Sequence, residues 1–555
     1  MVAMRLWSAL GAAVFLWGSG AWGQDAVVEQ VLGPVHGRRL HAVMTPDSLH
    51  YAYITAEGDT RKLFAVCDGK EQARYDGLKR ELVFSPSGSR FAYAAQKGDA
   101  WYYVIDGKLT GPYESTRAQT VRFSPDGKRL IFFAKREGKW RLVIDGREQR
   151  VTCDEFGKGS PQVNADLTRY AYHGCRGEWK TGEHFAVIDG VEGPMCDSIW
   201  PITFNPDGTR VAYRARQGDK QFVVVDGARG PDYDKIGKDN PVFSPDGKRV
   251  AYFAKKGDKW RLVLDGQEQP LLVDGFRSGH PVFSPDSRRV AYRACRGTWE
   301  DGKHFVVVDG VRGPEFDSLG SKAPSFYPDG SRVVYMAKRD GKWRLIDGTR
   351  EGPEYDTFSK GSPLLSPDGK HVACHMCIGE WEGGKHLVVL DGKEGPEFDE
   401  IAGLRFSPDS THCAYKGRRG DKWRLVLDGE EGPEYGDIAS AHPTFSPDSK
   451  RLAYEASMGE WRNGRHVLVL DGKQGPEYDW LLKLCPTFSA DSKHIVFAAK
   501  RGKKRLVVID GQEGPEYDEI LGGPPIMDEG GAVKYLAVLD GQLRRVTQRL
   551  APPAP

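Results

Sequence analysis

Apolar and polar positions follow one recurring pattern along this chain, and the pattern predicts short β-strands joined by tight turns. An apolar run at residues 241–244 ends in Pro245-Asp246-Gly247, which is a strong turn signal. Residues 249–254 are then apolar at both alternating sets of positions. A strand of this kind is expected to be covered on both faces.

The residues that follow predict two further strands. Residues 256–258 suit a tight hairpin. In the third strand that follows, Trp260, Leu262 and Leu264 alternate with Arg261 and Val263 up to the turn at Asp265-Gly266. In most copies a fourth segment follows, such as Gly-Pro-Glu-Tyr-Asp at 352–356, whose proline suits an edge strand. Each repeat therefore predicts four antiparallel strands, and the chain beyond its N-terminal segment shows no helical pattern.

The Pro-Asp-Gly turn marks a repeat that fills most of the 555 residues. Its central position falls at residues 47, 87, 126, 166, 207, 246, 286, 329, 368, 409, 448 and 491. One four-stranded sheet of this size buries too little apolar surface alone, whereas such sheets packed face to face around an axis form a β-propeller. We therefore expect an all-β fold of about 12–13 four-stranded antiparallel blades.

The phrase Phe-Ser-Pro-Asp-Gly-Lys-Arg-Val-Ala-Tyr at residues 243–252 resembles the WD40-like repeat often called PD40, which occurs in the TolB-type propeller. The resemblance covers residues from about 40 to 520. It implies a propeller fold and protein–protein interaction in the cell envelope, and it says little about activity. The N-terminal domain of TolB is absent, and so is the Gly-x-Ser-x-Gly phrase of the hydrolase domain that follows similar propellers in some exopeptidases.

The usual size of propellers bears on the number of rings. Rings of six or seven blades predict two tandem propellers, at 24–280 and 281–546, with a disordered tail at 547–555. A single ring of twelve or thirteen blades would be unusually wide. The chain ends keep that alternative open: Gly33-Pro34 suits a lone fourth strand and residues 534–540 suit a third strand, so the two ends together would complete one blade.

The N-terminus and the charge balance bear on location and partners. Arg5 precedes an apolar run at 6–17 that is too short to span a bilayer, and Ala21-Trp22-Gly23 suits a cleavage site. We expect residues 1–23 to be an export signal and the mature protein to be periplasmic or extracellular. The 79 basic and 77 acidic residues give no indication of a nucleic-acid partner. No later segment is apolar enough for a transmembrane span.

The hairpin between the second and third strands has a short and a long form. Short hairpins carry Trp five residues before the Asp-Gly turn; long hairpins carry His at that position and a new Trp five residues earlier. The long form supplies Trp179 and His184, Trp299 and His304, Trp381 and His386, and Trp461 and His466. Such side chains stack on sugars or peptides, so these eight residues are the candidate ligand or partner surface. The alternative is that each Trp covers its own hairpin and each His is a hydrogen-bonded spacer.

The short hairpins are also basic, as at Lys255-Lys256 and Arg418-Arg419, whereas the turns after the third strands lead into acidic segments. Since these two sets of turns lie on opposite faces of a propeller, one face would then be a basic rim that steers an anionic partner. The alternative is that solvated turns are simply charged.

The cysteines give little indication of a disulfide or a metal site. Nine cysteines leave at least one unpaired in a monomer, and Cys153 and Cys196 are the best candidates for a disulfide, with small buried side chains as the alternative. The phrase Cys374-His-Met-Cys377 resembles a metal site, but residues three apart on a strand face opposite sides, and no second pair stands at zinc-ribbon spacing. We expect no metal and no cofactor.

These observations favour a non-catalytic scaffold that binds a protein or glycan in the bacterial cell envelope. No catalytic constellation is visible in the sequence. Propeller enzymes, however, assemble their sites from loops around the central channel, with residues that are distant in sequence. A polysaccharide lyase or hydrolase with its site in the channel is therefore the alternative.

Overall fold

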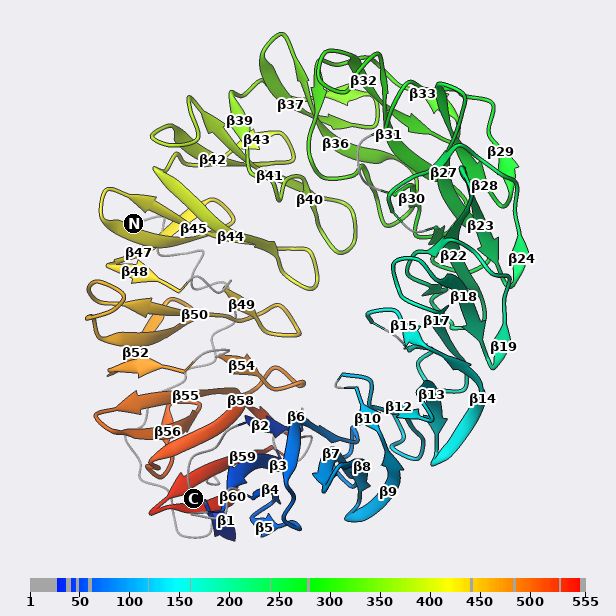
Figure 1. The fold of residues 1–555 in the computed structure, drawn as a ribbon. Coiled ribbons are helices and arrows are strands. Elements are labelled where there is room, and N and C mark those ends of the chain that lie inside the picture. Colours follow the sequence, from blue (N-terminus) through cyan, green and yellow to red (C-terminus); the bar gives the residue numbers. More distant parts are fainter. Residues whose placement is uncertain are drawn as a thin grey trace.

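The computed structural model describes residues 27–35, 41–45, 49–57, 62–117, 119–159, 161–239, 241–276, 280–439, 443–482, 486–528 and 531–549. Within these ranges the regular structure is entirely β, in 13 antiparallel sheets. The sheets are the blades of a propeller (Figure 1), as the repeat predicts. The expected export signal at 1–23 lies outside the described residues; of the expected tail, residues 547–549 complete the last strand and the rest lies outside.

Each blade has four strands in sequential order, except that the first strand is split into two halves in eight blades. The first strands face the opening at the centre and the fourth strands lie at the rim (Figure 1). We number the blades 1 to 13 in chain order, so that blade 1 is β2–β5 and blade 13 is β58–β60 together with β1.

The strand bounds follow in blade order. The first strands are β2 (His41–Met44), β6 (Gly77–Phe84), β10 (Ser115–Thr116) with β11 (Arg122–Phe123), β15 (Glu155–Phe156) with β16 (Gln162–Val163), β20 (Ser198–Ile199) with β21 (Thr203–Phe204), β25 (Lys235–Ile236) with β26 (Val242–Phe243), β30 (Val282–Phe283), β34 (Ser318–Leu319) with β35 (Ser325–Phe326), β39 (Thr357–Phe358) with β40 (Leu364–Leu365), β44 (Glu400–Phe406), β48 (Asp437–Ile438) with β49 (Thr444–Phe445), β53 (Trp480–Leu481) with β54 (Thr487–Phe488), and β58 (Glu519–Met527). The second strands are β3 (Tyr51–Ala56), β7 (Phe91–Lys97), β12 (Leu130–Arg136), β17 (Tyr170–Arg176), β22 (Val211–Gln217), β27 (Val250–Lys256), β31 (Val290–Arg296), β36 (Val333–Arg339), β41 (Val372–Ile378), β45 (Cys413–Arg419), β50 (Leu452–Ser457), β55 (Ile495–Arg501) and β59 (Ala532–Leu539). The third strands are β4 (Leu63–Cys67), β8 (Ala100–Ile105), β13 (Lys139–Ile144), β18 (Glu183–Ile188), β23 (Lys220–Val225), β28 (Lys259–Leu264), β32 (Lys303–Val308), β37 (Lys342–Asp347), β42 (Lys385–Leu390), β46 (Lys422–Leu427), β51 (His466–Leu470), β56 (Lys504–Ile509) and β60 (Gln542–Arg549). The fourth strands are β5 (Lys70–Glu71), β9 (Lys108–Tyr113), β14 (Arg147–Cys153), β19 (Val191–Glu192), β24 (Ala228–Arg229), β29 (Gln267–Glu268), β33 (Val311–Arg312), β38 (Arg350–Glu351), β43 (Lys393–Glu394), β47 (Glu430–Tyr435), β52 (Lys473–Tyr478), β57 (Gln512–Glu513) and β1 (Val27–Pro34).

The second strands are covered on both faces, as their pattern predicts. In β27, Val250, Tyr252 and Ala254 lie in the core shared with blade 5, and Ala251 and Phe253 lie in the core shared with blade 7. None of these side chains is more than 4% exposed. Because side chains alternate along a strand, one apolar run joins its blade to both neighbours.

Apolar cores of this kind connect all neighbouring blades around the ring. One core joins Ala251 of blade 6 to Val290 of blade 7, across the boundary expected at residue 280. Another joins Leu536 of blade 13 to Tyr53 of blade 1. The expected pair of tandem propellers is therefore not confirmed, because the face of blade 1 that would close a smaller ring is already covered by blade 13.

The two chain ends complete one blade, which is the alternative that the sequence left open, but the expected third strand at 534–540 is wrong, because β59 (Ala532–Leu539) is the second strand of that blade and β60 is the third. Strand β1 pairs antiparallel with β60 as the fourth strand of blade 13. The Glu29 carboxylate of β1 accepts from the Tyr517 hydroxyl at 2.5 Å and pairs with the Arg544 guanidinium. The N-terminal strand thus covers the free edge that β60 would otherwise expose.

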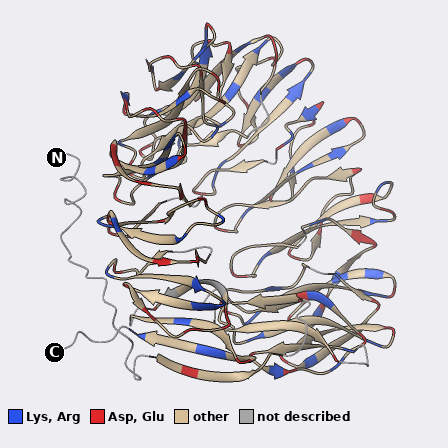
Figure 2. Cartoon of the chain, turned by 90° about the vertical axis from the view of Figure 1, so that its left-hand side faces the viewer, with Lys and Arg blue, Asp and Glu red and all other residues tan. Residues whose placement is uncertain are grey.

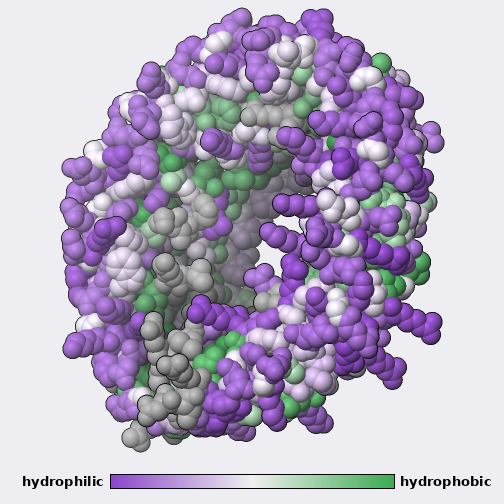
Figure 3. Space-filling view, in the orientation of Figure 1, coloured by the Kyte–Doolittle hydropathy of each residue, from purple (hydrophilic) through white to green (hydrophobic). Residues whose placement is uncertain are grey.

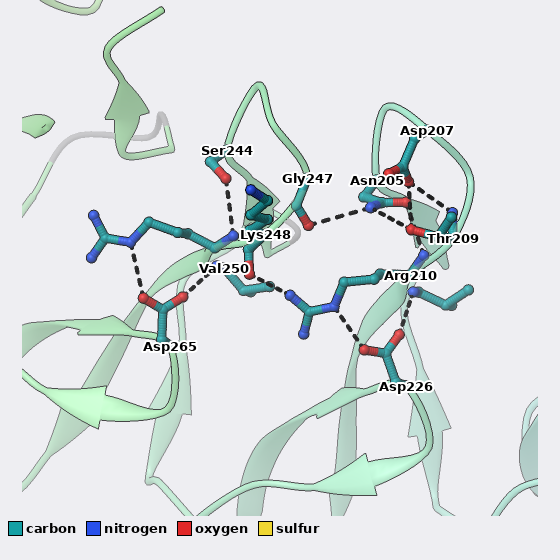
Figure 4. Close-up of polar contacts among 12 residues, drawn as sticks. Asn205, Asp207, Thr209, Arg210, Asp226, Ser244, Gly247, Lys248, Val250 and Asp265 are labelled. Atoms are coloured by element: carbon teal, nitrogen blue, oxygen red, sulfur yellow. Dashed lines mark hydrogen bonds and ion pairs between the residues drawn. The ribbon is translucent and has the colours of Figure 1, made fainter. Parts of the chain in front are cut away.

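The Pro-Asp-Gly repeat also contains an arginine that reaches the next blade (Figure 4). Arg210 donates through Nε to Asp226 of its own blade at 2.8 Å and through its terminal nitrogen to the backbone carbonyl of Lys248 at 2.5 Å. The same cross-blade bond to a carbonyl 38 to 42 residues further along is made by Arg90, Arg129, Arg169, Arg249, Arg289 and Arg451. A charge-assisted bond of this kind is stronger than a neutral one.

The turn itself is built by its own side chains. The Ser244 hydroxyl donates to Asp246 at 2.6 Å and accepts from the amide of Arg249 at 2.9 Å. At Gly247, φ is +72° and a Cβ would come within 2.5 Å of the Asn205 side chain in blade 5. Where serine stands instead, as at Ser287, its hydroxyl accepts the amide of Asp246 from the preceding blade at 3.0 Å. These turns therefore fasten one blade to the next.

The suggested disulfide is not formed, since both of its cysteines are free. Cys153 belongs to the core between blades 3 and 4, and Cys196 belongs to the core between blades 4 and 5. The sheet of blade 4 therefore separates the two thiols. In the part of the chain that the structure describes, no helix is long and apolar enough to cross a membrane.

Candidate functional site

The four predicted Trp–His pairs each form within one blade. The ring centroids lie 4.8 Å apart for Trp179 and His184, with the planes nearly perpendicular. The corresponding contacts in the other long hairpins are Trp299–His304 at 4.2 Å, Trp381–His386 at 4.6 Å and Trp461–His466 at 4.7 Å. These pairs belong to blades 4, 7, 9 and 11, so the structure brings each Trp to its own His and leaves the four pairs apart.

The histidines are buried and the tryptophans are more accessible. His184, His304, His386 and His466 are each at most 4% exposed. Trp381 is 43% exposed, and the other three indoles are half-buried. Any ligand therefore meets the Trp of a long hairpin first, and the His lies beneath it.

His and Trp alternate at one structural position, as the spacing predicts. His184 is the strand partner of Cys175, and Trp260 of the short blade 6 is the strand partner of Lys255 at the equivalent register. In blade 6 this indole packs edge-on against Phe276 at 4.7 Å. In two long blades the hairpin Trp packs on a ring of its own blade, Trp179 on His173 at 4.6 Å and Trp381 on His375 at 5.1 Å between ring centroids, which supports its role as a cover for that blade.

Three of these histidines, His184, His386 and His466, have a side-chain hydrogen-bond partner at Nδ1. His386 Nε2 lies 3.1 Å from the Trp381 carbonyl, which only accepts, so Nε2 carries the proton. Its Nδ1 is then an acceptor, and it lies 2.9 Å from Nε2 of His375. Blade 4 repeats the arrangement with His173 Nε2 at 2.8 Å from His184 Nδ1. Burial lowers the pKa of His173 to about 3 and that of His375 to about 4, so both are neutral at pH 7.

The partner of the buried His is the fourth residue of the second strand, which sequence reasoning missed. This position is His173 in blade 4, His375 in blade 9 and Glu455 in blade 11. Glu455 lies 2.9 Å from His466 Nδ1, and burial raises its pKa to about 8, so it donates as a neutral acid. A polar residue inside an otherwise apolar strand is the signal that would have identified these positions.

The same position holds buried cations in other blades. Arg214 donates to the carbonyl of Gly237 in the next blade at 2.5 Å and lies over the Trp200 ring at 3.8 Å. Lys416 donates to the Ile438 carbonyl of the next blade at 2.6 Å. Burial lowers the pKa of both groups. These cations stabilise the inner edge of the neighbouring blade.

The first strands line an open central channel, into which hydrophilic side chains project from the right-hand side, whereas apolar residues show on the wall at the upper left (Figure 3). Where a first strand is split or bulged, the described residues between its halves leave the inner edge of the sheet. We call seven of these segments, those of blades 2 to 6, 8 and 9, the inner loops, and their described residues are 79–81, 117, 119–121, 157–159, 161, 200–202, 237–239, 241, 320–324 and 359–363. Their described charges are Lys79, Arg80, Arg117, Lys158, Lys238, Lys322 and Lys360 against Glu81 and Asp239. Basic side chains thus outnumber acidic ones among the described residues of these inner loops, although the whole chain carries a net charge of only +2.

Some inner-loop cations are structural and others are not. The Lys322 ammonium donates to the Pro363 carbonyl of the next blade at 2.8 Å, and Lys79 donates to the Thr116 carbonyl of the next blade. Burial lowers the pKa of both lysines. Lys158, Lys238 and Lys360 are exposed and form no ion pair with any described residue. An anionic ligand in the channel would meet these three cations, and also Arg80, which is exposed and forms no ion pair with any described residue.

The arginines of the basic hairpins in the short blades pair with acids of the same blade. Arg136 pairs with Glu148 at 2.7 Å and Arg419 with Glu431 at 2.7 Å. Figure 2 shows basic and acidic residues mixed over the blades. The expected basic rim is therefore weaker in these blades than its sequence suggests, whereas Lys255 and Lys256 of blade 6 form no ion pair with any described residue.

The chain is similar to solved β-propeller structures at low identity. A eukaryotic initiation factor structure matches with 11% identity and a TM-score of 0.30, covering 66% of this chain and 91% of that one. TolB from Acinetobacter baumannii matches with 19% identity and a TM-score of 0.21, covering 40% and 63%. Oligogalacturonate lyase from Vibrio parahaemolyticus matches with 13% identity and a TM-score of 0.23, covering 56% and 99%. No protein-family model matches the chain, and no curated protein matches it.

Proposed function

We propose that this chain is an exported, non-catalytic WD40-like propeller that serves as an interaction or ligand-binding scaffold in the bacterial cell envelope. The observation that carries the proposal is a contrast within each blade. The turns that fasten blade to blade keep one geometry, whereas the hairpin between the second and third strands changes in length and chemistry. A rigid frame with variable loops is the arrangement by which scaffolds present binding surfaces.

The apolar N-terminal segment at 1–23 supports export, and the resemblance to envelope propellers supports the location. The partner classes that suit the surface are proteins and glycans, since the hairpins offer indole rings and the channel offers cations. Several cysteines are unsuited to act as nucleophiles, because burial raises the pKa of Cys153, Cys374 and Cys413 to about 12.

Two assays on the purified mature protein test the proposal. Immobilised protein is incubated with an envelope extract, and bound material is compared with that retained by a variant in which hairpin 379–385 is replaced by the short hairpin of blade 6. We expect a specific partner on the natural protein and less of it on the variant. In parallel, a panel of glycans and peptides is followed for turnover; reproducible turnover would overturn the non-catalytic scaffold in favour of a propeller enzyme.

A further inference from the structure

A cavity of about 180 Å³ lies between blades 4 and 5, beside the first of the Trp–His pairs. Blade 4 contributes Lys158 from an inner loop, His173 from β17 and Trp179 from the long hairpin. Blade 5 contributes an apolar wall that includes Ile199 and Ile202. The cavity thus combines a cation, a polar ring, an indole and an aliphatic wall.

His173 offers the cavity an acceptor. Its Nε2 proton is committed to His184, so Nδ1 of the neutral ring accepts. No described residue donates to this nitrogen. It lies beside Gly157, where a Cβ would come within 3.3 Å of it. The glycine therefore keeps the approach to Nδ1 open from that side.

We propose that this cavity binds an acidic sugar residue, a single pyranose ring that carries a carboxylate. The Trp179 indole suits the apolar face of the ring, the His173 acceptor suits a hydroxyl, and the Lys158 ammonium suits the carboxylate. The volume is below the range of about 300–1,000 Å³ that is usual for drug-sized ligands, and it suits one ring. This inference rests on the proposed scaffold function and deepens it by naming the ligand class.

The chain builds the same set of groups a second time, five blades further around the ring. Blade 9 has Lys360, His375, Trp381 and His386 in the places of Lys158, His173, Trp179 and His184. The inner loops are Gly-Lys-Gly-Ser-Pro at 157–161 and Ser-Lys-Gly-Ser-Pro at 359–363. One difference is Ser359, whose side chain stands where Gly157 leaves space. We therefore expect two sites of one specificity, with the tighter binding at blade 4.

Blade 6 offers a matched control for the lysine. Lys238 is exposed on an inner loop at the same position as Lys158, but Phe253 replaces the polar His and Trp260 replaces the buried His. A lysine that acts only through the general charge of the channel would matter as much at 238 as at 158. A lysine that belongs to a built site would matter only at 158.

The test uses the mature protein labelled with 5-fluorotryptophan and observed by ¹⁹F NMR. The probes are methyl glucuronoside and methyl glucoside. They differ only at C6, which is a carboxylate in the first and a hydroxymethyl group in the second. We expect the glucuronoside to shift two indole resonances, those that disappear in Trp179→Phe and Trp381→Phe. We expect Lys158→Gln to weaken binding at Trp179 by about tenfold, and Lys238→Gln to leave it unchanged.

Three outcomes would overturn the inference: equal binding of the two glycosides, an equal effect of Lys238→Gln, or tighter binding of benzoate, which would indicate a site for aromatic acids. Capture of an envelope protein without any indole shift would overturn this inference and leave the scaffold function standing. Because the Lys158 side chain is exposed, Lys158→Gln should fold normally, and it tests the site even where a Trp variant fails to fold.

Discussion

Arg210 binds the backbone carbonyl of Lys248 across a blade boundary, at 2.5 Å. The same guanidinium pairs with Asp226 in its own blade, so one side chain joins the Asp-Gly turn of blade 5 to the Pro-Asp-Gly turn of blade 6. Both turns are part of the repeat that the sequence shows most plainly. The repeat is therefore a fastening device, and the variable chemistry lies elsewhere in each blade.

Replacing Arg210 by Ala is expected to loosen the boundary between blades 5 and 6. The change removes a partly exposed ion pair and a charge-assisted hydrogen bond, which together contribute about 1–3 kcal/mol. Amide hydrogen exchange of β22 and β27 measures the local free energy of opening. Lys248→Ala is the control, because it leaves the accepting carbonyl in place; an equal effect of both variants would contradict the role of Arg210.

Two glycines with the same backbone strain should differ in their tolerance of a side chain. Gly146 has a φ of +79° with nothing within 4 Å of an added Cβ, whereas Gly369 has a φ of +70° and its Cβ would lie 2.3 Å from Cδ of Pro328. We expect Gly146→Ala to cost about 1 kcal/mol and Gly369→Ala clearly more, because a proline ring cannot move aside easily. Denaturant unfolding of the two variants checks this order, and equal costs would refute it.

Removal of residues 27–35 should open the ring edge. The deletion leaves β60 without its partner strand and removes the contacts of Glu29 with Tyr517 and Arg544. An uncovered edge strand pairs with other chains, so we expect oligomers in size-exclusion chromatography with light scattering. The point variant Glu29→Gln keeps the strand, so we expect it to have the same particle mass as the natural protein. A deletion variant that is fully monomeric would contradict this role of β1.

The buried acid of blade 11 predicts a pH dependence of stability. Burial raises the pKa of Glu455 from 4.5 to about 8, so the folded protein holds this proton more tightly than the unfolded chain does. Its contribution to stability is then greatest at and below pH 4.5, falls as the pH rises to about 8, and is level above that.

The difference in thermal midpoint between Glu455→Gln and the natural protein isolates this effect, because His173 and His375 titrate equally in both. We expect the Gln variant to gain relative stability steadily between about pH 4.5 and pH 8, by a few kcal/mol at most. A difference that does not change with pH would show that the carboxyl keeps its ordinary pKa.

The fold was largely predictable because each element of the repeat is a local signal. The buried second strand, the Asp-Gly turn and the edge strand all follow from residues within one copy, such as 249–266. The number of blades in a ring was not predictable in this way. Each copy specifies its own sheet and the faces for its two neighbours, and the same faces suit a small or a large ring. Closure depends on contacts between distant parts of the chain, namely the pairing of Val27–Pro34 with β60 and the core between blades 13 and 1.

The candidate site was predictable in part. Their spacing from the Asp-Gly turn identified Trp179, His184 and their equivalents, because the long hairpins differ from the short form that the other repeats share. It did not identify His173 or Lys158, which lie in a strand and an inner loop that meet the hairpin only after folding. The cavity also needs Ile199 of the next blade, so no single repeat contains the site.

We propose that one closed ring of 13 blades presents the variable hairpins and the inner-loop cations as a single binding frame. Electron cryo-microscopy of the purified mature protein tests it most directly. We expect particles with one open channel and 13 blades, in which the closing blade contains both chain ends. Particles with two separate rings of six or seven blades would contradict it.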